Sequence, residues 1–429
     1  MSSYSTSLRR SASFLVFTSG LYLAACASPH LNSYSASQSP SSAPTSAPTS
    51  SPSDPPSSNP PSSDPSSSTA PANVAYVYVS SAAATGGGNE IQAFDAAGNG
   101  ALTPMNGSPF AGDVTQLAVS GSQLIAANRD GVDLESYAVG SGGALTQEAT
   151  TNAGTASPSG GGNCNSLGPL FFDSTGATVY DMEFRGSDCA NNDYVSFAVG
   201  SNGALTALGE SAANAWFSQP AAFIAGNTYA YTASCIADMD WIIDGFQRGS
   251  NGLLTEINVN ATPPTPPAGH FYCPSVVATD NANHVAIAMQ PVNQQSFTSD
   301  EPEQIAVYTA ASNGTLTTTS TAADMPQVQV GTVNDLKISK SGRLLAVAGT
   351  TGLQVFAFNG TGPGSSGAGV LTSDSIDQIF WDGSGNLYAL SRGAGKLYVF
   401  MSNGYGVVAA PGSPYAITQP QNLTVLPVS

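Results

Sequence analysis

One repeated pattern limits the folds that this chain can adopt. Its clearest copy is YVSFAVGSNGALT (residues 194–206), in which alternating apolar residues end in an aromatic, a turn with glycine follows, and Leu-Thr closes the unit. Alternation with a period of two is typical of β-strands. Further copies stand at residues 91–103, 134–146, 241–255 and 305–317, and looser ones at 353–372 and 396–408.

The spacing of the copies indicates the kind of repeat protein. The anchoring aromatics follow one another at intervals of about 50 residues, and repeats of this length with several short strands are typical of β-propellers. The sequence therefore predicts an all-β fold, a seven-bladed β-propeller with four-stranded blades. The seven aromatics are Phe94, Tyr137, Phe197, Phe246, Tyr308, Phe356 and Phe400.

The two ends of the propeller are expected to join. AYVYVS (75–80) has the character of a second strand, so the innermost strand of blade 1 is missing at the amino end. QNLTVLP (421–427) follows after blade 7 is complete. We expect it to become the innermost strand of blade 1, which removes an open sheet edge. The innermost strands of blades 3 to 7 are expected near 170–173, 221–224, 276–279, 336–339 and 378–381.

The amino-terminal segment has the features of an export signal. Arg9 and Arg10 precede an apolar stretch, 13–26, that is shorter than the roughly 20 residues needed to span a bilayer. Leu-Ala-Ala-Cys at 23–26 resembles the lipobox of bacterial lipoproteins, which implies residues 1–25 as signal peptide and a lipid on Cys26. An ordinary leader that contains a cysteine is the alternative, and the two arginines give a weak sign of twin-arginine export.

A tether is expected after the leader. Residues 26–73 are rich in Ser, Pro and Thr and lack large apolar side chains, so they cannot bury enough surface to order themselves. The propeller would then occupy 74–429. The expected localisation is extracytoplasmic, as a membrane-anchored lipoprotein, and Ala27 after the cysteine favours the outer membrane or cell surface by resemblance to Gram-negative lipoproteins.

The charge balance argues against one class of partner. Lys and Arg number 10 against 28 Asp and Glu, which gives a formal net charge of −18. Such an acidic surface repels phosphate backbones. Nucleic acid is therefore not an expected partner, whereas the membrane, through the lipid, and an envelope protein or glycan are.

Four cysteines remain beyond Cys26, and an even number in an exported chain suggests two disulfides with three possible connectivities. On the blade map all four fall on one face, and we favour the nearest neighbours, Cys164 with Cys189 and Cys235 with Cys273. A metal site is the rival interpretation, but the chain has no C-x-x-C spacing and few histidines. We expect no metal and no cofactor.

Candidate site residues gather at one mouth of the expected channel, where the long loops 150–167 and 261–273 also fall. His270 is the one histidine placed there for acid–base work, since His30 lies in the tether and His284 in a turn on the opposite face. A loop histidine packed among prolines, and a surface ion pair of Glu183 with Arg185, are the alternatives. The catalytic candidates are Glu183, Arg185 and His270, and the binding candidates are Asn128, Arg129, Asp238, Asp240, Trp241, Tyr272, Gln290 and Arg392.

Two segments carry a resemblance to a known family. QAFDAAGNGALTPMNGSPF (92–110) and APGSPYAITQPQNLTV (410–425) resemble the bacterial lactonase-like propellers, a group similar to the seven-bladed 6-phosphogluconolactonases and to YVTN-type surface repeats. The resemblance implies the fold. A phosphorylated sugar lactone requires cationic side chains, and two of the ten Lys and Arg lie in the leader, so that substrate is not expected.

Two functions follow as hypotheses. The first is a lipid-anchored module that binds a protein or glycan through its loop-rich face. The alternative is a lactonase-like hydrolase acting on a sugar lactone, in which Glu183 or His270 activates water and an arginine holds the carbonyl or a carboxylate. A purely structural envelope protein is a third possibility.

Overall fold

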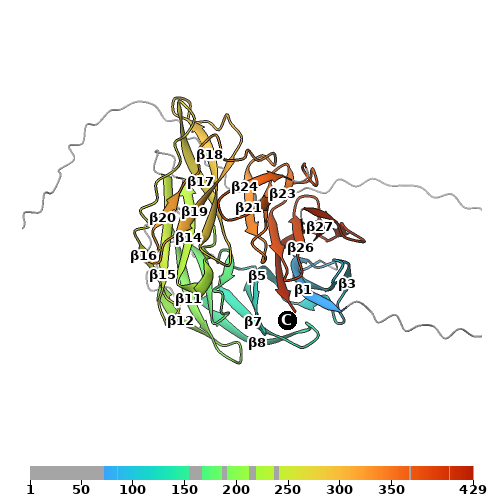
Figure 1. The fold of residues 1–429 in the computed structure, drawn as a ribbon. Coiled ribbons are helices and arrows are strands. Elements are labelled where there is room, and N and C mark those ends of the chain that lie inside the picture. The colour runs from blue at the N-terminus through green and yellow to red at the C-terminus, as the bar shows by residue number, and fades with distance from the viewer. Residues whose placement is uncertain are drawn as a thin grey trace, which may run out of the picture. The chain divides into compact units, whose positions relative to one another are not determined.

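A computed structural model gives the fold of the chain (Figure 1). The structure describes residues 72–84, 86–153, 167–185, 191–211, 219–235, 241–366, 369–404 and 406–428, all within the compact unit Ser68–Ser429. These residues form seven separate antiparallel sheets, which are the seven blades of a β-propeller. The predicted fold class is thus confirmed. No helix among the described residues is long and apolar enough to cross a membrane.

The blades, each given from its innermost strand outward, have the following bounds. Blade 1 consists of β30 (Pro420–Pro427), β1 (Asn73–Ala82), β2 (Asn89–Ala97) and β3 (Leu102–Pro104), and β4 (Phe110–Ala111) also pairs with β2. Blade 2 consists of β5 (Val114–Ser120), β6 (Gln123–Asn128), β7 (Asp133–Val139) and β8 (Leu145–Asn152). Blade 3 consists of β9 (Leu170–Phe172), β10 (Thr178–Arg185), β11 (Asn191–Val199) and β12 (Leu205–Glu210).

Blade 4 has β13 (Ala222–Phe223), a 3₁₀ turn (Ala225–Asn227), β14 (Tyr229–Cys235), β15 (Trp241–Arg248) and β16 (Leu254–Ile257). Blade 5 consists of β17 (His270–Thr279), β18 (His284–Asn293), β19 (Gln304–Ala310) and β20 (Leu316–Thr318). Blade 6 consists of β21 (Val333–Ile338), β22 (Leu344–Gly349), β23 (Gly352–Phe358) and β24 (Pro363–Ser366). Blade 7 consists of β25 (Gln378–Trp381), β26 (Asn386–Ser391), β27 (Lys396–Ser402) and β28 (Val407–Ala409), and β29 (Tyr415–Ala416) also pairs with β27.

The carboxyl-terminal strand closes the circle, as predicted. β30 pairs antiparallel with β1, with Val425 opposite Val77 and Leu423 opposite Val79. Side chains of this sheet join residues of blade 7, such as Leu390, in one buried apolar cluster. The core therefore lies between neighbouring blades, and the last strand supplies part of the contact between the first blade and the seventh.

The repeated turn has a structural purpose that explains its sequence. Its glycine adopts a left-handed conformation, with φ of +76° at Gly143 and +96° at Gly252, which favours glycine. A Cβ on Gly143 would lie 2.6 Å from the ring of Tyr76 in the preceding blade. The carbonyl of Gly143 accepts a 2.7 Å hydrogen bond from the buried Tyr78 hydroxyl. The repeat is therefore a contact between blades.

A second set of contacts links the innermost strands. In several blades, a polar side chain of the innermost strand accepts a hydrogen bond from a backbone N–H group. That N–H group belongs to the innermost strand of the next blade. This keeps buried N–H groups satisfied where innermost strands have no inner neighbour. The pairs, acceptor first, are Asp335 with Ile379, Gln378 with Leu423, and Asn422 with Leu117, at 2.9, 2.9 and 3.1 Å.

Blade 5 departs from the prediction at its innermost strand. The sequence places His270 to Cys273 in a loop before that strand, yet β17 begins at His270 and these residues pair with Gln290–Asn293 of β18. The prediction was wrong here because the pairing depends on a long partner strand rather than on local alternation. The other innermost strands begin within a few residues of the expected positions.

Candidate functional site

The mouth face is formed where the second strands end and the innermost strands begin. Arg129 directly follows β6 and pairs with Asp113, directly before β5, at 3.2 Å. Arg392 directly follows β26 and pairs with Asp377, directly before β25, at 3.0 Å. The two arginines thus occupy equivalent places on blades 2 and 7. Both are about half-exposed, at 57% and 50%.

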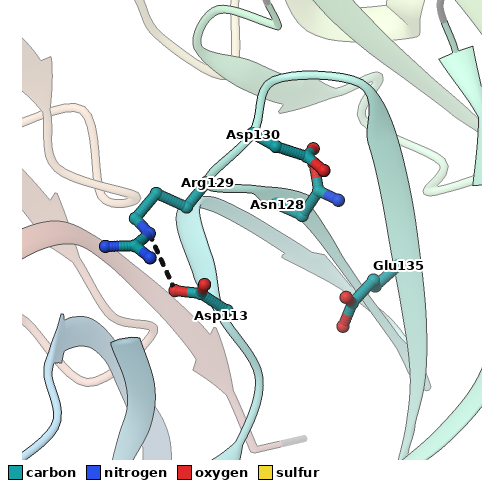
Figure 2. Close-up of a pocket in the computed structure, with 5 residues that line it drawn as sticks. All are labelled: Asp113, Asn128, Arg129, Asp130 and Glu135. Atoms are coloured by element: carbon teal, nitrogen blue, oxygen red, sulfur yellow. Dashed lines mark ion pairs between the residues drawn. The ribbon is translucent and has the colours of Figure 1, made fainter. Parts of the chain in front are cut away.

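A pocket of about 430 Å³ lies beside Arg129 and is lined by Asp113, Asn128, Arg129, Asp130 and Glu135. Figure 2 shows Arg129 and Asp113 turned toward each other, with Glu135 apart from that pair. The Asn128 side chain accepts hydrogen bonds from the N–H groups of Val132 and Asp133, so it holds its own loop. Among the described residues no group of three Asp, Glu, His or Cys side chains could hold a metal ion.

His270 is placed on the mouth face, but neither ring nitrogen is free. Nε2 lies 2.8 Å from Asp300 and Nδ1 lies 3.0 Å from the carbonyl oxygen of Ala268. The hydrogen bond to Asp300, and then the Ala268 carbonyl, raise the pKa of His270 although desolvation opposes them. Since both partners are acceptors, the arrangement favours the protonated imidazolium. Such a ring stabilises a loop and is poorly suited to take a proton.

Tyr272 and Gln290 are also engaged in internal contacts. The Tyr272 side chain is buried, its hydroxyl donates a 2.7 Å hydrogen bond to Gln304, and burial raises its pKa to about 12. The Gln290 amide donates to the carbonyl oxygens of Pro291 and Glu301. These two residues shape the blade-5 part of the mouth face.

The remaining candidates fall outside what the structure describes. Glu183 and Arg185 belong to the mouth end of β10 and Trp241 starts β15, but their side chains lie outside the described part. Asp238, Asp240, Cys26, Cys164 and Cys189 are outside the described residues altogether.

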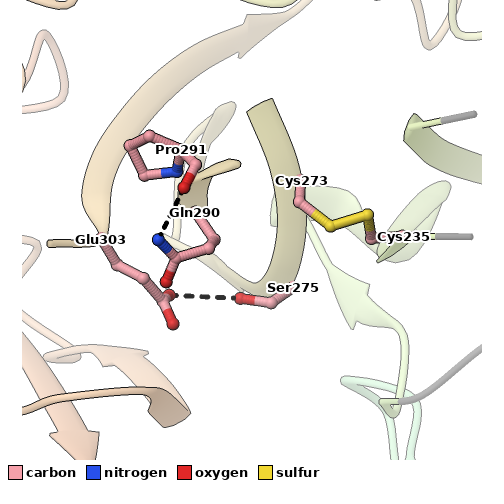
Figure 3. The surroundings of a disulfide bond; sticks show 6 residues. All are labelled: Cys235, Cys273, Ser275, Gln290, Pro291 and Glu303. Atoms are coloured by element: carbon pink, nitrogen blue, oxygen red, sulfur yellow. Dashed lines mark hydrogen bonds between the residues drawn. A yellow bond between two sulfur atoms is a disulfide. The ribbon is translucent and has the colours of Figure 1, made fainter. Parts of the chain in front are cut away.

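One of the two favoured disulfides is present. Cys235, at the end of β14, is bonded to Cys273 in β17, 38 positions further along the sequence (Figure 3). This confirms the predicted pair of Cys235 with Cys273. The bond ties blade 4 to blade 5 two residues before Ser275, so it helps to fix the innermost strand at the mouth.

Sequence reasoning missed the most unusual ionisable group of this face. Glu303 directly precedes β19, and its side chain is 2% exposed. One carboxylate oxygen accepts a 3.0 Å hydrogen bond from the N–H of Val333 in blade 6. The other accepts a 3.4 Å hydrogen bond from the hydroxyl of Ser275, a partly buried residue of the innermost strand β17 (Figure 3).

Burial sets the protonation behaviour of Glu303. Desolvation raises its pKa to about 7, although the hydrogen bonds from Val333 and Ser275 oppose the shift. None of the described ion pairs includes it. A carboxyl group that titrates near neutral pH beside a hydroxyl is suited to general acid–base chemistry. The segment SDEPEQ (299–304) contains three acidic residues, and the sequence alone does not indicate which of them is buried.

The comparisons with known proteins agree on the fold. No family model and no curated protein matches the chain. The periplasmic gluconolactonase of Pseudomonas aeruginosa is 14% identical, with a TM-score of 0.55, and the match covers 83% of this chain and all of that one. Proposed 6-phosphogluconolactonases of Bacteroides fragilis and Bacteroides uniformis are 13% and 15% identical, with TM-scores of 0.57 and 0.58, over 85% and 83% of this chain and all of theirs.

These identities are low, so the likeness concerns the architecture. It agrees with the seven-sheet fold and with the resemblance carried by residues 92–110 and 410–425. The chain therefore has the seven-bladed β-propeller fold of the lactonase-like proteins.

Proposed function

We propose that this protein hydrolyses a lactone at the mouth of the propeller, with Glu303 as the general base. The observation that carries the proposal is the contact of buried Glu303 with Ser275 on an innermost strand. The gluconolactonase named among the similar structures supports the reaction class. Glu303 takes the place that the sequence hypothesis gave to Glu183 or His270.

The contact supports a proton relay. A water molecule attacks the lactone carbonyl carbon and gives a proton to Ser275 Oγ, while the Ser275 proton passes to Glu303 Oε2. The carbonyl carbon gains a bond to the water oxygen, and its bond to the ring oxygen then breaks. The proton returns through Ser275 to the departing ring oxygen, so that the product is a hydroxy acid and Glu303 is again ionised.

The surroundings favour a neutral substrate. Arg129 and Arg392 belong to blades 2 and 7, whereas Glu303 lies in blade 5, and each arginine is paired with an aspartate. A phosphate group on the substrate would need unpaired cationic side chains around it. We therefore expect neutral sugar lactones to be better substrates than phosphorylated ones.

The test is hydrolysis of a panel of neutral and phosphorylated sugar lactones by the purified full-length protein. Glu303→Gln should lower kcat/KM at least 100-fold, since a positioned base contributes about 10²–10⁴-fold. Asp335→Asn is the matched control, because Asp335 also accepts a backbone N–H from the next blade but does not contact Ser275. It should retain activity. No turnover of any lactone by the folded protein would contradict the proposal.

An extracytoplasmic, lipid-anchored state is part of the same proposal. The Cys235–Cys273 disulfide suits an oxidising compartment, and one of the similar structures is a periplasmic protein. Intact-mass analysis of the mature protein beside a Cys26→Ser variant tests lipidation, which should be lost in the variant. Binding of an envelope protein stays a prediction.

A further inference from the structure

Blade 5 carries an extension that the other described blades lack. The innermost strand β17 has ten residues, whereas the innermost strands β30, β5, β9, β13, β21 and β25 have eight, seven, three, two, six and four. Its partner β18 also has ten residues. Pro274 of β17 corresponds to Val114 at the start of β5 and Val333 at the start of β21. Each of the three pairs with the second strand directly before a shift in register. The four residues before it, His270–Cys273, and the segment 290–300 therefore form a projection, here called the blade-5 spur (Figure 1).

The spur is held in one conformation. At its base, the disulfide ties Cys273 to Cys235 of blade 4. At its tip, the Asn293 side chain accepts hydrogen bonds from the N–H groups of Gln295 and Ser296, at 2.9 and 3.2 Å, and donates one to Asp300 at 3.0 Å. His270 binds the same Asp300. A ligand that meets this loop therefore meets a preorganised surface, which lowers the entropy cost of binding.

The tip presents an aromatic ring to solvent. Phe297 is 53% exposed, and the other large exposed hydrophobic residues among those described are valines. Its φ is +54°, a conformation that is uncommon and strained for a bulky residue. Its ring lies 6.4 Å from that of Phe271 in β17. The contact with Phe271 leaves about half of Phe297 open to solvent, so the ring is available for stacking with a ligand.

The size and chemistry of the spur favour one class of ligand. A stable protein interface buries about 800 Å² on each partner, which far exceeds one isolated ring, whereas a single sugar ring matches an aromatic ring in area. The neighbouring exposed side chains, Gln295, Ser296 and Thr298, are amides and hydroxyls that can pair with sugar hydroxyls. The formal net charge of −18 disfavours anionic polymers.

We propose that the blade-5 spur is a binding site for neutral carbohydrate, in which a sugar ring stacks on Phe297. The site would hold a glycan chain at the rim of the propeller, on the same loop that ends at Glu303. It is independent of lactone hydrolysis, because oligosaccharides without a lactone should bind.

The test is titration calorimetry of the full-length protein with four neutral pentasaccharides: a β-1,4-glucan, an α-1,4-glucan, an α-mannan and a β-1,4-linked N-acetylglucosamine oligomer. At least one should bind, with micromolar to millimolar Kd. Phe297→Ala should weaken that binding at least tenfold and Phe297→Tyr should retain it, because a tyrosine keeps the aromatic face. The control Val408→Ala removes an apolar side chain of similar exposure on blade 7 and should leave the binding unchanged.

Two results would overturn the proposal. One is the absence of binding to all four pentasaccharides by the wild type. The other is equal binding by wild type and Phe297→Ala. Association with a protein that depends on Phe297, without pentasaccharide binding, would assign the spur to a protein partner instead.

Discussion

The hydroxyl of Ser275 donates a 3.4 Å hydrogen bond to Glu303, and the carboxyl group of Glu303 is buried between blades 5 and 6 without an ion-pair partner among the described residues. Such a group is costly to ionise. Its other oxygen accepts the Val333 N–H, so the same residue links two blades and offers a base to the innermost strand. This double role leads to the first prediction.

Glu303→Gln should stabilise the protein at alkaline pH. The folded-state pKa is raised by burial from 4.5 to about 7, so the unfolded state loses its proton first. Stability therefore falls as pH rises from about 4.5 to about 7 and levels off above that. The amide carries no charge to bury. Between pH 5 and pH 9 the variant should gain about 2.5 kcal/mol relative to wild type, since each pKa unit corresponds to about 1.4 kcal/mol. Urea unfolding at both pH values measures this. A stability difference that is the same at both would contradict the buried, ionising carboxyl.

Arg248→Met should destabilise the protein strongly. Arg248 pairs with Asp173, whose side chain is fully buried. This ion pair links blade 3 to blade 4. Removing one partner of a buried pair costs about 3–5 kcal/mol. Arg129→Met is the control, because its pair with Asp113 is about half-exposed, and the expected cost is below about 1 kcal/mol. Equal losses in urea unfolding would mean that the pair of Arg248 is not buried in solution.

The ion pair of Arg248 with Asp173 should make the free energy of unfolding fall at acid pH, which urea unfolding as a function of pH measures. Burial acts to raise the pKa of Asp173, but the hydrogen bond from Thr175 and the charge of Arg248 outweigh it, so the pKa lies below its usual value. The stabilisation is present above the unfolded-state value of 3.8 and is lost as pH falls through the lowered pKa.

Gly143→Ala should be more harmful than Gly121→Ala. Both glycines have positive φ, +76° and +56°, and an alanine in that conformation costs about 1–2 kcal/mol. At Gly121 no atom lies within 4 Å of the new Cβ, whereas at Gly143 it meets the ring of Tyr76. The clash should add about 1–3 kcal/mol. Equal losses in free energy of unfolding would show that the turn does not press on the neighbouring blade.

Removing residues 420–429 should abolish cooperative folding. β30 is the only innermost strand that pairs with β1 in the described sheet, and without it the apolar face of blade 1 and the unpaired edge of β1 are exposed. Thermal unfolding monitored by circular dichroism should lose its transition. A truncated protein that melts in one sharp transition near the wild-type temperature would contradict closure by this strand.

The sequence allowed most of the fold to be predicted because the repeat is an inter-blade contact. Gly143 and its counterparts recur for a local steric reason, and the apolar alternation of residues 421–427 had no other place to pair. The pair Cys235–Cys273 could be predicted from blade positions.

The candidate site was harder to predict because it depends on burial. Nothing local to SDEPEQ distinguishes Glu303, which is packed against Val333 of the next blade, from exposed Glu301. His270 was a reasonable candidate by type and place, yet its use of both ring nitrogens depends on Asp300, thirty residues away in the chain and held by Asn293. Long-range contacts of this kind leave no periodic signal.

The most direct test of the account is the pH dependence of kcat/KM for a neutral sugar lactone, in wild type and Glu303→Gln. The account predicts that wild-type kcat/KM rises with pH and levels off above an apparent pKa of about 7, and that this step and most of the activity disappear in the variant. Hydrolysis that proceeds equally in Glu303→Gln, with the same pH profile, would contradict the assignment of Glu303 as the base.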